Sequence, residues 1–321
     1  MEKLQAAIEI ARKRREAERG DTPPAPVPAA GQGAGRGPAP GPDPSPAPQA
    51  PPQPAGRAAT APATARPAHA PQASRPAAGG AGTGKDGLWQ ALAPIDLDQA
   101  ALVRSRILSH SASRESTPFD VLRTKVLYQM RQNGWRRLAI TSPLPRCGKT
   151  TTAVNLALAL GRQPELRSML FDFDLRGPAV ADKLGLPRPA SIAPLLRGDR
   201  DMADHGCRFG PNLALALSGE PEPDPTRLLM AETTRDTLAR IQDSYAPDIL
   251  IFDLPSILIG DDARAFLQHV DCALILARAD QTRYGDLDSC EREVAEYTNI
   301  LGVVLNGYRH SDGKVDAEGG A

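Results

Sequence analysis

The feature that most constrains this chain is the loop at residues 141–152, Thr-Ser-Pro-Leu-Pro-Arg-Cys-Gly-Lys-Thr-Thr-Thr, between an apolar run and a helix-forming run. Residues 137–141 have the composition of the end of a buried strand, and residues 151–162 are rich in helix formers without proline. A strand that passes through a tight loop into a helix directs backbone N–H groups and the positive end of the helix dipole at the loop. The loop is therefore predicted to bind an anion.

The residues of this loop suit the phosphates of a nucleotide. Lys149 would contact the terminal phosphates, and the Thr150 hydroxyl would be a ligand of the Mg²⁺ that bridges them. Pro143 stands where the G-x-x-x-x-G-K-[ST] pattern has its first glycine, so Gly-Lys-Thr alone is explained equally well by a helix N-terminus with a solvated lysine. The expected loop contacts with the nucleotide are Pro145, Arg146, Cys147, Gly148, Lys149, Thr150 and Thr151.

Carboxylates follow two further apolar runs, at the points where strands are expected to end. Asp172 and Asp174 could hold Mg²⁺ through water or accept a proton from an attacking hydroxyl. Asp253 ends an apolar run in the Walker B arrangement, which anchors the metal from the side opposite Thr150. An aspartate that caps a turn explains any one of these alone. Three such sites in this order favour a nucleotide site with Thr150, Asp172 and Asp253 as its metal ligands.

From about residue 85 to residue 308, strand-like and helix-like runs alternate, and the domain is expected to cover residues 85–321. This alternation predicts one α/β domain, a mostly parallel sheet between two layers of helices (a three-layer α/β/α fold). Because ligands bind beyond the carboxyl ends of parallel strands, the loop and the aspartates are expected to converge there. The expected strands are 138–141, 169–171, 213–217, 249–252, 273–277 and 303–305, and the expected helices include 233–244, 263–269 and 287–297.

Composition sets two segments apart from this domain. Seventeen of the 32 prolines fall within residues 21–84, whose Pro, Ala and Gly composition predicts a disordered linker that cannot bury a core. Residues 1–20 are predicted to form a short amphipathic basic helix, with a small apolar face followed by the basic run 12–15. A docking helix for a protein, a membrane-surface contact and a frayed solvated helix all remain open for this segment.

The cysteines and the hydropathy indicate the compartment. Four cysteines without a C-x-x-C pair suggest neither a disulfide framework nor a zinc site, which favours a reducing environment. The chain has no run of 18 apolar residues, and its first residues lack the features of a signal peptide. We therefore expect a cytoplasmic protein.

Taken together, the motifs resemble those of the bacterial tyrosine kinases of capsule and exopolysaccharide systems, relatives of the partition and septum-site ATPases. Residues 141–150 follow the T-S-x-x-P-x-x-G-K-[ST] loop of that family, and Ser256 replaces the second proline of its third motif. Later patterns are echoed at Arg278, Thr282 and Asn306. The matched positions of its second and third motifs are Asp172, Asp174, Arg176, Pro178, Asp253, Pro255, Asp262 and Ala263.

The resemblance implies a protein-tyrosine kinase that transfers the γ-phosphoryl group of Mg-ATP and regulates exopolysaccharide or capsule synthesis or export. It adds Arg278 and Asn306 to the nucleotide contacts. It also implies a membrane polysaccharide chain-length (co-polymerase) protein as the activator that recruits the chain to the inner face of the membrane. Homo-oligomers are an open alternative, and no nucleic-acid partner is expected. The implied catalytic residues are Lys149, Asp172, Asp174 and Arg176.

Two questions stay open at this stage. Arg176 either stabilises developing charge or forms an ion pair with Asp172 or Asp174. Family members that autophosphorylate end in a tyrosine cluster, whereas this chain has five tyrosines in all and only Tyr308 after Asn306. The alternative function is therefore a switch ATPase of the MinD/ParA kind, without kinase activity, that regulates a membrane polysaccharide partner.

Overall fold

The computed structural model describes residues 84–308. Its centre is an eight-stranded sheet with the order β1-β4-β5-β3-β6-β2-β7-β8. Only the β4/β5 pair is antiparallel among the described strands. This order confirms the predicted α/β fold with a mostly parallel sheet. The helix predicted at residues 1–20 and almost all of the linker predicted at 21–84 lie outside the described residues.

The six expected strands are all present, each within a few residues of its expected bounds. Two more strands, β1 and β4, lie together at one edge of the sheet and were not predicted. The strands are β1 (Ala93–Pro94), β2 (Arg137–Thr141), β3 (Ser168–Asp172), β4 (Cys207–Phe209), β5 (Leu213–Ala216), β6 (Ile249–Asp253), β7 (Cys272–Arg278) and β8 (Asn299–Asn306).

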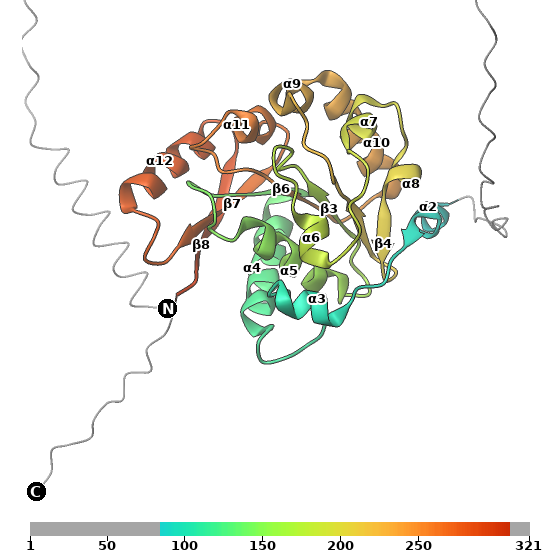
Figure 1. Ribbon diagram of the computed structural model, residues 1–321, viewed down its shortest axis with the longest axis horizontal. Helices are drawn as coiled ribbons and strands as arrows, with labels where there is room; N and C mark the ends of the chain where they lie inside the picture. Colours follow the sequence, from blue (N-terminus) through green and yellow to red (C-terminus); the bar gives the residue numbers. More distant parts are fainter. Residues whose placement is uncertain (1–83, 309–321) are drawn as a thin grey trace, which may run out of the picture. The chain divides into compact units, whose positions relative to one another are not determined.

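Helices cover both faces of this sheet (Figure 1). One layer contains α3 to α6, and the other contains α2, α7 and α9 to α12. The helices are α2 (Lys85–Ala91), α3 (Gln99–Arg104), α4 (Thr117–Asn133), α5 (Lys149–Gly161), α6 (Val180–Leu184), α7 (Ala193–Arg197), α8 (Met202–His205), α9 (Pro225–Met230), α10 (Glu232–Tyr245), α11 (Asp262–Leu267) and α12 (Tyr284–Ala295).

The core is divided by the sheet into two hydrophobic clusters, because successive side chains of a strand point to opposite faces. In β2, for example, Leu138 and Ile140 pack on the side of α5, whereas Ala139 packs on the other side. The strands at the centre are buried on both faces, which explains why they read as continuous apolar runs in the sequence. The predicted three-layer arrangement is therefore confirmed.

The strand register places the ends of the central strands together. Asp253 at the end of β6 is paired with Asp172 of β3 on one side and with Ile140 of β2 on the other. Below these ends, Phe171 and Phe252 stack with ring centroids 5.1 Å apart and contact two further buried phenylalanines. This aromatic cluster packs against the ends of β3 and β6, where the loops that follow these strands begin.

Within residues 84–308, none of the helices combines the length and the apolar character needed to cross a bilayer.

Candidate nucleotide-binding site

A cavity of about 800 Å³ opens at the carboxyl ends of the central strands. It brings together most of the residues that the sequence singled out. Those that line it are Pro145, Arg146, Gly148, Lys149, Thr150, Thr151, Asp174, Arg278 and Asn306. Cys147, Asp172, Arg176 and Asp253 do not line it.

The loop between β2 and α5 is held in shape by the ends of β7 and β8. The Asn306 side-chain amide donates to the Cys147 carbonyl oxygen (2.9 Å), and the Arg278 guanidinium donates to the Arg146 carbonyl oxygen (2.8 Å). Gly148 has a φ of +94°, and a Cβ atom there would lie 2.1 Å from the Asn306 amide nitrogen. Only glycine satisfies both conditions, which explains why Gly148 precedes the helix.

Cys147 contributes its backbone to this loop rather than its thiol. Its side chain is buried and faces Thr282, with 3.7 Å between Sγ and the hydroxyl oxygen. The predicted contact of Cys147 with the nucleotide is therefore limited to backbone groups.

Lys149 begins α5, and its side chain is only 8% exposed. Its Nζ donates to the Ser256 hydroxyl (3.0 Å), which in turn lies 3.2 Å from the Ser142 hydroxyl. Ser256 is the position at which the chain departs from the family motif. Its role as the hydrogen-bond acceptor of Lys149 was not predicted from the sequence, in which the departure from the motif was the available signal.

The two strand-end carboxylates are fully buried beside this lysine. Asp172 accepts hydrogen bonds through Oδ2 from the Ala179 and Val180 N–H groups (3.0 and 2.9 Å), while its Oδ1 has no partner. Neither oxygen of Asp253 has a hydrogen-bond partner among the described residues. These oxygens cannot remain charged and unpartnered in the interior without a large cost.

Burial is accordingly the main influence on the pKa of both groups. Burial, together with the charge of Asp253, raises the pKa of Asp172 well above its usual range. Burial raises the pKa of Asp253 to about 7, against the opposing influence of the Thr150 hydroxyl and the Lys149 ammonium. A cation at this place would favour the ionised forms of both carboxyl groups.

The unpartnered oxygens of Asp172 and Asp253, beside the Thr150 hydroxyl, fit a magnesium ion. Mg²⁺ prefers oxygen ligands and is commonly held by one or two carboxylates, with waters and substrate phosphates completing its shell. This explains why no group of three or more His, Cys, Asp or Glu side chains in residues 84–308 is placed to hold a metal by itself.

Asp174 lies on the loop that follows β3 and faces the cavity. Burial raises its pKa, while the nearby Lys149 charge and a hydrogen bond from the Gly177 N–H lower it. It is the one acidic side chain among the described cavity-lining residues. This position suits a group that accepts a proton from a substrate hydroxyl.

Arg176 makes an ion pair that neither interpretation of the sequence included. Its guanidinium forms a bidentate pair with Asp262 at 2.6 and 3.0 Å, and Asp262 also accepts from the Thr226 hydroxyl (2.5 Å). Asp172 is unavailable as a partner because it is fully buried and binds the start of α6. The ion pair expected between Arg176 and Asp172 or Asp174 is thus replaced by one that ties the β3 loop to α11.

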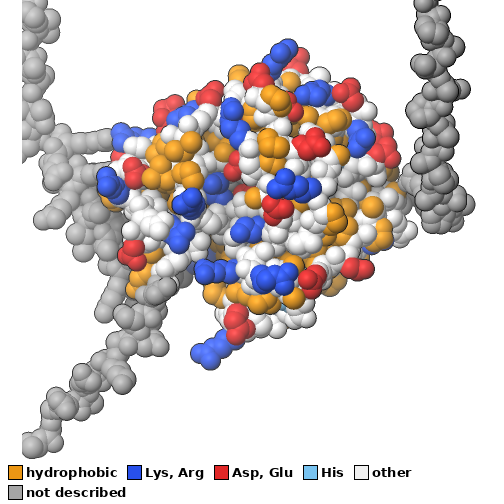
Figure 2. Space-filling view, in the orientation of Figure 1, with side chains coloured by type: hydrophobic (Ala, Val, Ile, Leu, Met, Phe, Trp, Pro, Cys, Tyr) orange, Lys and Arg blue, Asp and Glu red, His pale blue; other side chains and the backbone are white. Residues whose placement is uncertain are grey.

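The cavity also contains cationic residues that carry no motif in the sequence. Arg104 is the last residue of α3, Arg106 comes from the segment after α3, and Lys183 comes from α6. Figure 2 shows Lys and Arg side chains gathered over the middle of this face, around α5 and the end of β8. Only the tertiary structure brings these residues to the loop. The result is a cavity lined by six Lys and Arg residues and one carboxylate, as an anionic ligand requires.

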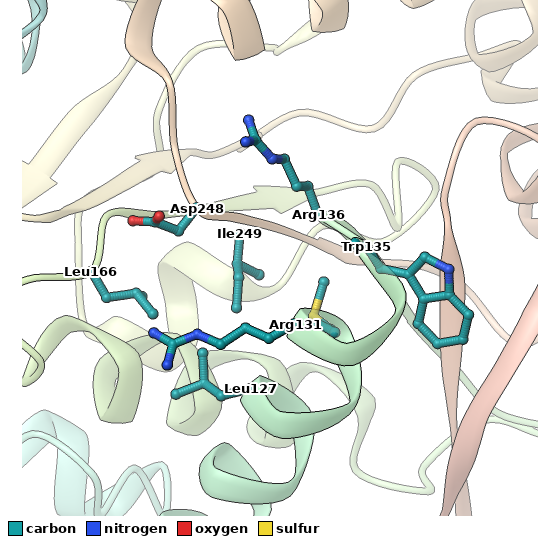
Figure 3. Close-up of a pocket in the computed structure, with 9 residues that line it drawn as sticks. Leu127, Arg131, Trp135, Arg136, Leu166, Asp248 and Ile249 are labelled. Atoms are coloured by element: carbon teal, nitrogen blue, oxygen red, sulfur yellow. The ribbon is translucent and has the colours of Figure 1, made fainter.

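A second cavity, of about 240 Å³, lies at the amino ends of β2 and β6 (Figure 3). Figure 3 shows Arg131 extending from α4 alongside Leu127, with Asp248 and Ile249 on the other side. None of the predicted site residues lines it. Because ligands of such sheets bind at the carboxyl ends, the larger cavity is the candidate site.

Comparison with known proteins agrees with this geometry. Residues 138–318, more than half of the chain, match the CbiA family model, described as the CobQ/CobB/MinD/ParA nucleotide binding domain. Tyrosine-protein kinase CpsD of Streptococcus pneumoniae is 27% identical over 175 residues, which cover 53% of this chain and 74% of CpsD. Tyrosine-protein kinase YwqD of Bacillus subtilis is 25% identical over 206 residues, which cover 64% of this chain and 86% of YwqD.

Solved structures show the same fold. The kinase domain of the Escherichia coli tyrosine kinase ETK superposes with a TM-score of 0.57 at 24% identity, covering 65% of this chain and 82% of that domain. The VpsO kinase domain superposes with a TM-score of 0.54 at 25% identity, covering 60% of this chain and 96% of that domain. The chain therefore belongs to the CobQ/CobB/MinD/ParA family of nucleotide-binding proteins.

Proposed function

We propose that this chain is a protein-tyrosine kinase that uses Mg-ATP and regulates the synthesis or export of an exopolysaccharide or capsule. The observation that carries the proposal is the cationic cavity around Lys149, with the unpartnered carboxylates of Asp172 and Asp253 beside it. The naming of CpsD and YwqD as tyrosine-protein kinases supports tyrosine as the acceptor.

The chain would bind the triphosphate mainly through the loop and α5. Lys149 would exchange its Ser256 partner for the phosphates, and the backbone N–H groups at the start of α5 would bind the same oxygens. Thr150, Asp172 and Asp253 would hold Mg²⁺. When bound, Mg²⁺ neutralises phosphate charge, which lowers the barrier to phosphoryl transfer. Phosphoryl transfer depends mostly on such positioning and charge neutralisation.

Asp174 would receive the proton of the tyrosine hydroxyl. It lies in the cavity, and burial raises its pKa, so it is a stronger base than an ordinary carboxylate. Arg176, held by Asp262, would orient the loop on which Asp174 lies rather than contact the phosphates. The remaining contacts that we propose for the nucleotide are Pro145, Arg146, Cys147, Gly148, Thr151, Arg278 and Asn306.

We also propose a membrane protein of the polysaccharide chain-length class as the activating partner. The chain would then work on the cytoplasmic side of the membrane, recruited by that partner. The family resemblance supports this part of the proposal.

The second candidate function is a switch ATPase without kinase activity. The distribution of the tyrosines favours it, because the exposed tyrosines do not form a cluster in the sequence. They are Tyr128 in α4, Tyr284 at the start of α12, Tyr297 in the turn after α12, and Tyr308 after β8. The MinD and ParA proteins named in the family description support it as well.

Phosphotyrosine mapping separates the two functions. The purified chain is incubated with Mg-ATP, alone and with its candidate membrane partner, and both chains are examined by mass spectrometry. Kinase function predicts phosphotyrosine on at least one chain. Slow ATP hydrolysis without phosphotyrosine on either chain would establish the switch ATPase instead.

A further inference from the structure

The segment that follows α3 enters the cavity in an unusual backbone conformation. α3 ends in a Schellman motif, in which the Ile107 N–H donates to the Leu102 carbonyl (2.8 Å) and the Arg106 N–H donates to the Val103 carbonyl (3.0 Å). This motif needs a left-handed residue at its centre, and Arg106 occupies that position with a φ of 59°.

Within residues 84–308, three other helices end with the same pair of hydrogen bonds, and each has glycine at this position. They are α4, α6 and α7, with Gly134, Gly185 and Gly198. Glycine avoids the Cβ clash of the left-handed conformation, whereas arginine does not. Arg106 therefore stands where helix termination favours glycine, and of the four left-handed residues only Arg106 lines the cavity. Strained residues of this kind cluster at functional sites.

A buried side chain of α5 holds the strained segment in place. The Oδ1 of Asn155 accepts from the Leu108 and Ser109 N–H groups (2.7 and 3.0 Å), and its Nδ2 donates to the Arg106 carbonyl (3.1 Å). The same amide donates to the Thr151 carbonyl (2.8 Å) in the first turn of α5. Asn155 thus fixes the position of Arg106 relative to the phosphate loop.

The guanidinium of Arg106 is available for an anion. Arg106 lines the cavity together with the phosphate loop, and it forms no ion pair with any residue in the range 84–308. Its neighbour Arg104, in contrast, lies 3.9 Å from a carboxylate oxygen of Asp98. Arginine is suited to phosphate because its planar group makes two parallel charge-assisted hydrogen bonds.

We infer that Arg106 binds the phosphate chain of the nucleotide, and that Asn155 is the positioning residue that holds it there. The inference rests on the proposed nucleotide site. It adds Arg106, a phosphate-binding residue that lies outside the loop and strand-end motifs. The hydrogen bonds from Asn155 hold Arg106 in its strained conformation, and the guanidinium supplies a phosphate contact for which glycine has no side chain.

The Arg106→Gly variant tests this, because it removes the cation and relieves the strain together. We expect thermal stability without nucleotide to be unchanged or higher. We expect the affinity for Mg-ADP, measured by calorimetry, to fall at least about ten-fold, as is typical when a charge-assisted hydrogen bond is lost. Ala246→Gly is the matched control, because Ala246 ends α10 with a φ of 45° and does not line the cavity. It should leave Mg-ADP affinity unchanged.

A double-mutant cycle tests the role of Asn155. If Asn155 acts through Arg106, Asn155→Ala should weaken Mg-ADP binding in the unmodified protein but have little further effect in the Arg106→Gly variant. If the losses of Mg-ADP affinity caused by the two substitutions simply add in the double variant, the positioning role of Asn155 is refuted. Affinity of Arg106→Gly within two-fold of the unmodified protein would overturn the phosphate contact. Failure of the unmodified protein to bind Mg-ADP would instead contradict the proposed function itself.

Discussion

Lys149 illustrates how a single side chain can be ready for its ligand. It is nearly buried, and its ammonium group donates a hydrogen bond to the Ser256 hydroxyl. When the nucleotide binds, this ammonium group would exchange a neutral hydroxyl for the charged oxygens of a phosphate. No ion pair with another described residue has to be broken for this exchange.

The first prediction concerns this residue. Lys149→Met should leave the fold intact and reduce ATP affinity by about 10- to 100-fold or more, since a hydrogen bond to a charged group contributes about 1.5–3 kcal/mol. Isothermal calorimetry measures this, with Lys125→Met on the exposed face of α4 as the control. Equal affinity in both variants would refute the assignment of the phosphate site.

The second prediction concerns the pH dependence of stability. The pKa of Asp253 is about 7 in the folded protein and near 4 in the unfolded chain, so the folded state binds the extra proton between these values. Its contribution to stability is fully present below about pH 4 and is lost as the pH rises through about 7. Asp253→Asn removes this loss, so it should stabilise the protein without nucleotide by more than about 1 kcal/mol at pH 8.

At pH 5 the gain from Asp253→Asn should be much smaller, because the carboxyl group is then protonated in the folded protein. Urea unfolding at both pH values, without Mg²⁺ or nucleotide, measures the difference. A variant that is less stable than the parent at pH 8 would show that Asp253 is not destabilised by burial.

At the scale of elements, the strands that could be predicted from the sequence are those formed by continuous apolar runs. The central strands are apolar on both faces, and the Gly-Lys-Thr loop and Asp253 mark their carboxyl ends, so the core of the site followed from parallel-sheet topology. β1 and β4 were missed because strands of two and three residues have no period that a sequence can show.

The parts of the site that the sequence did not reveal depend on contacts between distant segments. Arg106 reaches the cavity through Asn155, 49 positions further along the chain. Arg176 pairs with Asp262, 86 positions away, although both were recognised as motif positions. Neither pairing could be derived from local composition, because each is set by how α3 and α11 pack.

The third prediction concerns the loop before α5. Gly148→Ala should disable nucleotide binding, because a Cβ atom would collide with the Asn306 amide and break its hydrogen bond to the loop. Gly134→Ala is the matched control: it has a positive φ of 68° but no atom within 4 Å of the added Cβ. The control should lose about 1 kcal/mol of stability and retain nucleotide affinity. Calorimetry and thermal unfolding of both variants distinguish steric from conformational effects.

At the scale of the whole molecule, the proposed domain boundary at about residue 85 leads to a fourth prediction. Limited proteolysis should remove the Pro, Ala and Gly-rich segment and leave a core that still binds ATP. Mass spectrometry of the protected fragment, followed by calorimetry, tests both parts. Protection of residues 21–84 from the protease, or loss of ATP binding by the core, would refute this division of the chain.

The proposed function requires that a phosphoryl group is transferred to tyrosine in the cavity, with Asp174 as the proton acceptor. The most direct measurement is the rate of phosphotyrosine formation with Mg-ATP and the membrane partner, in the unmodified chain and in Asp174→Asn. We expect a rate lower by about 10² to 10⁴ in the variant, with little change in ATP affinity, because acid–base assistance alone is lost. An undiminished rate in Asp174→Asn, or no phosphotyrosine in the unmodified chain, would contradict this proposal.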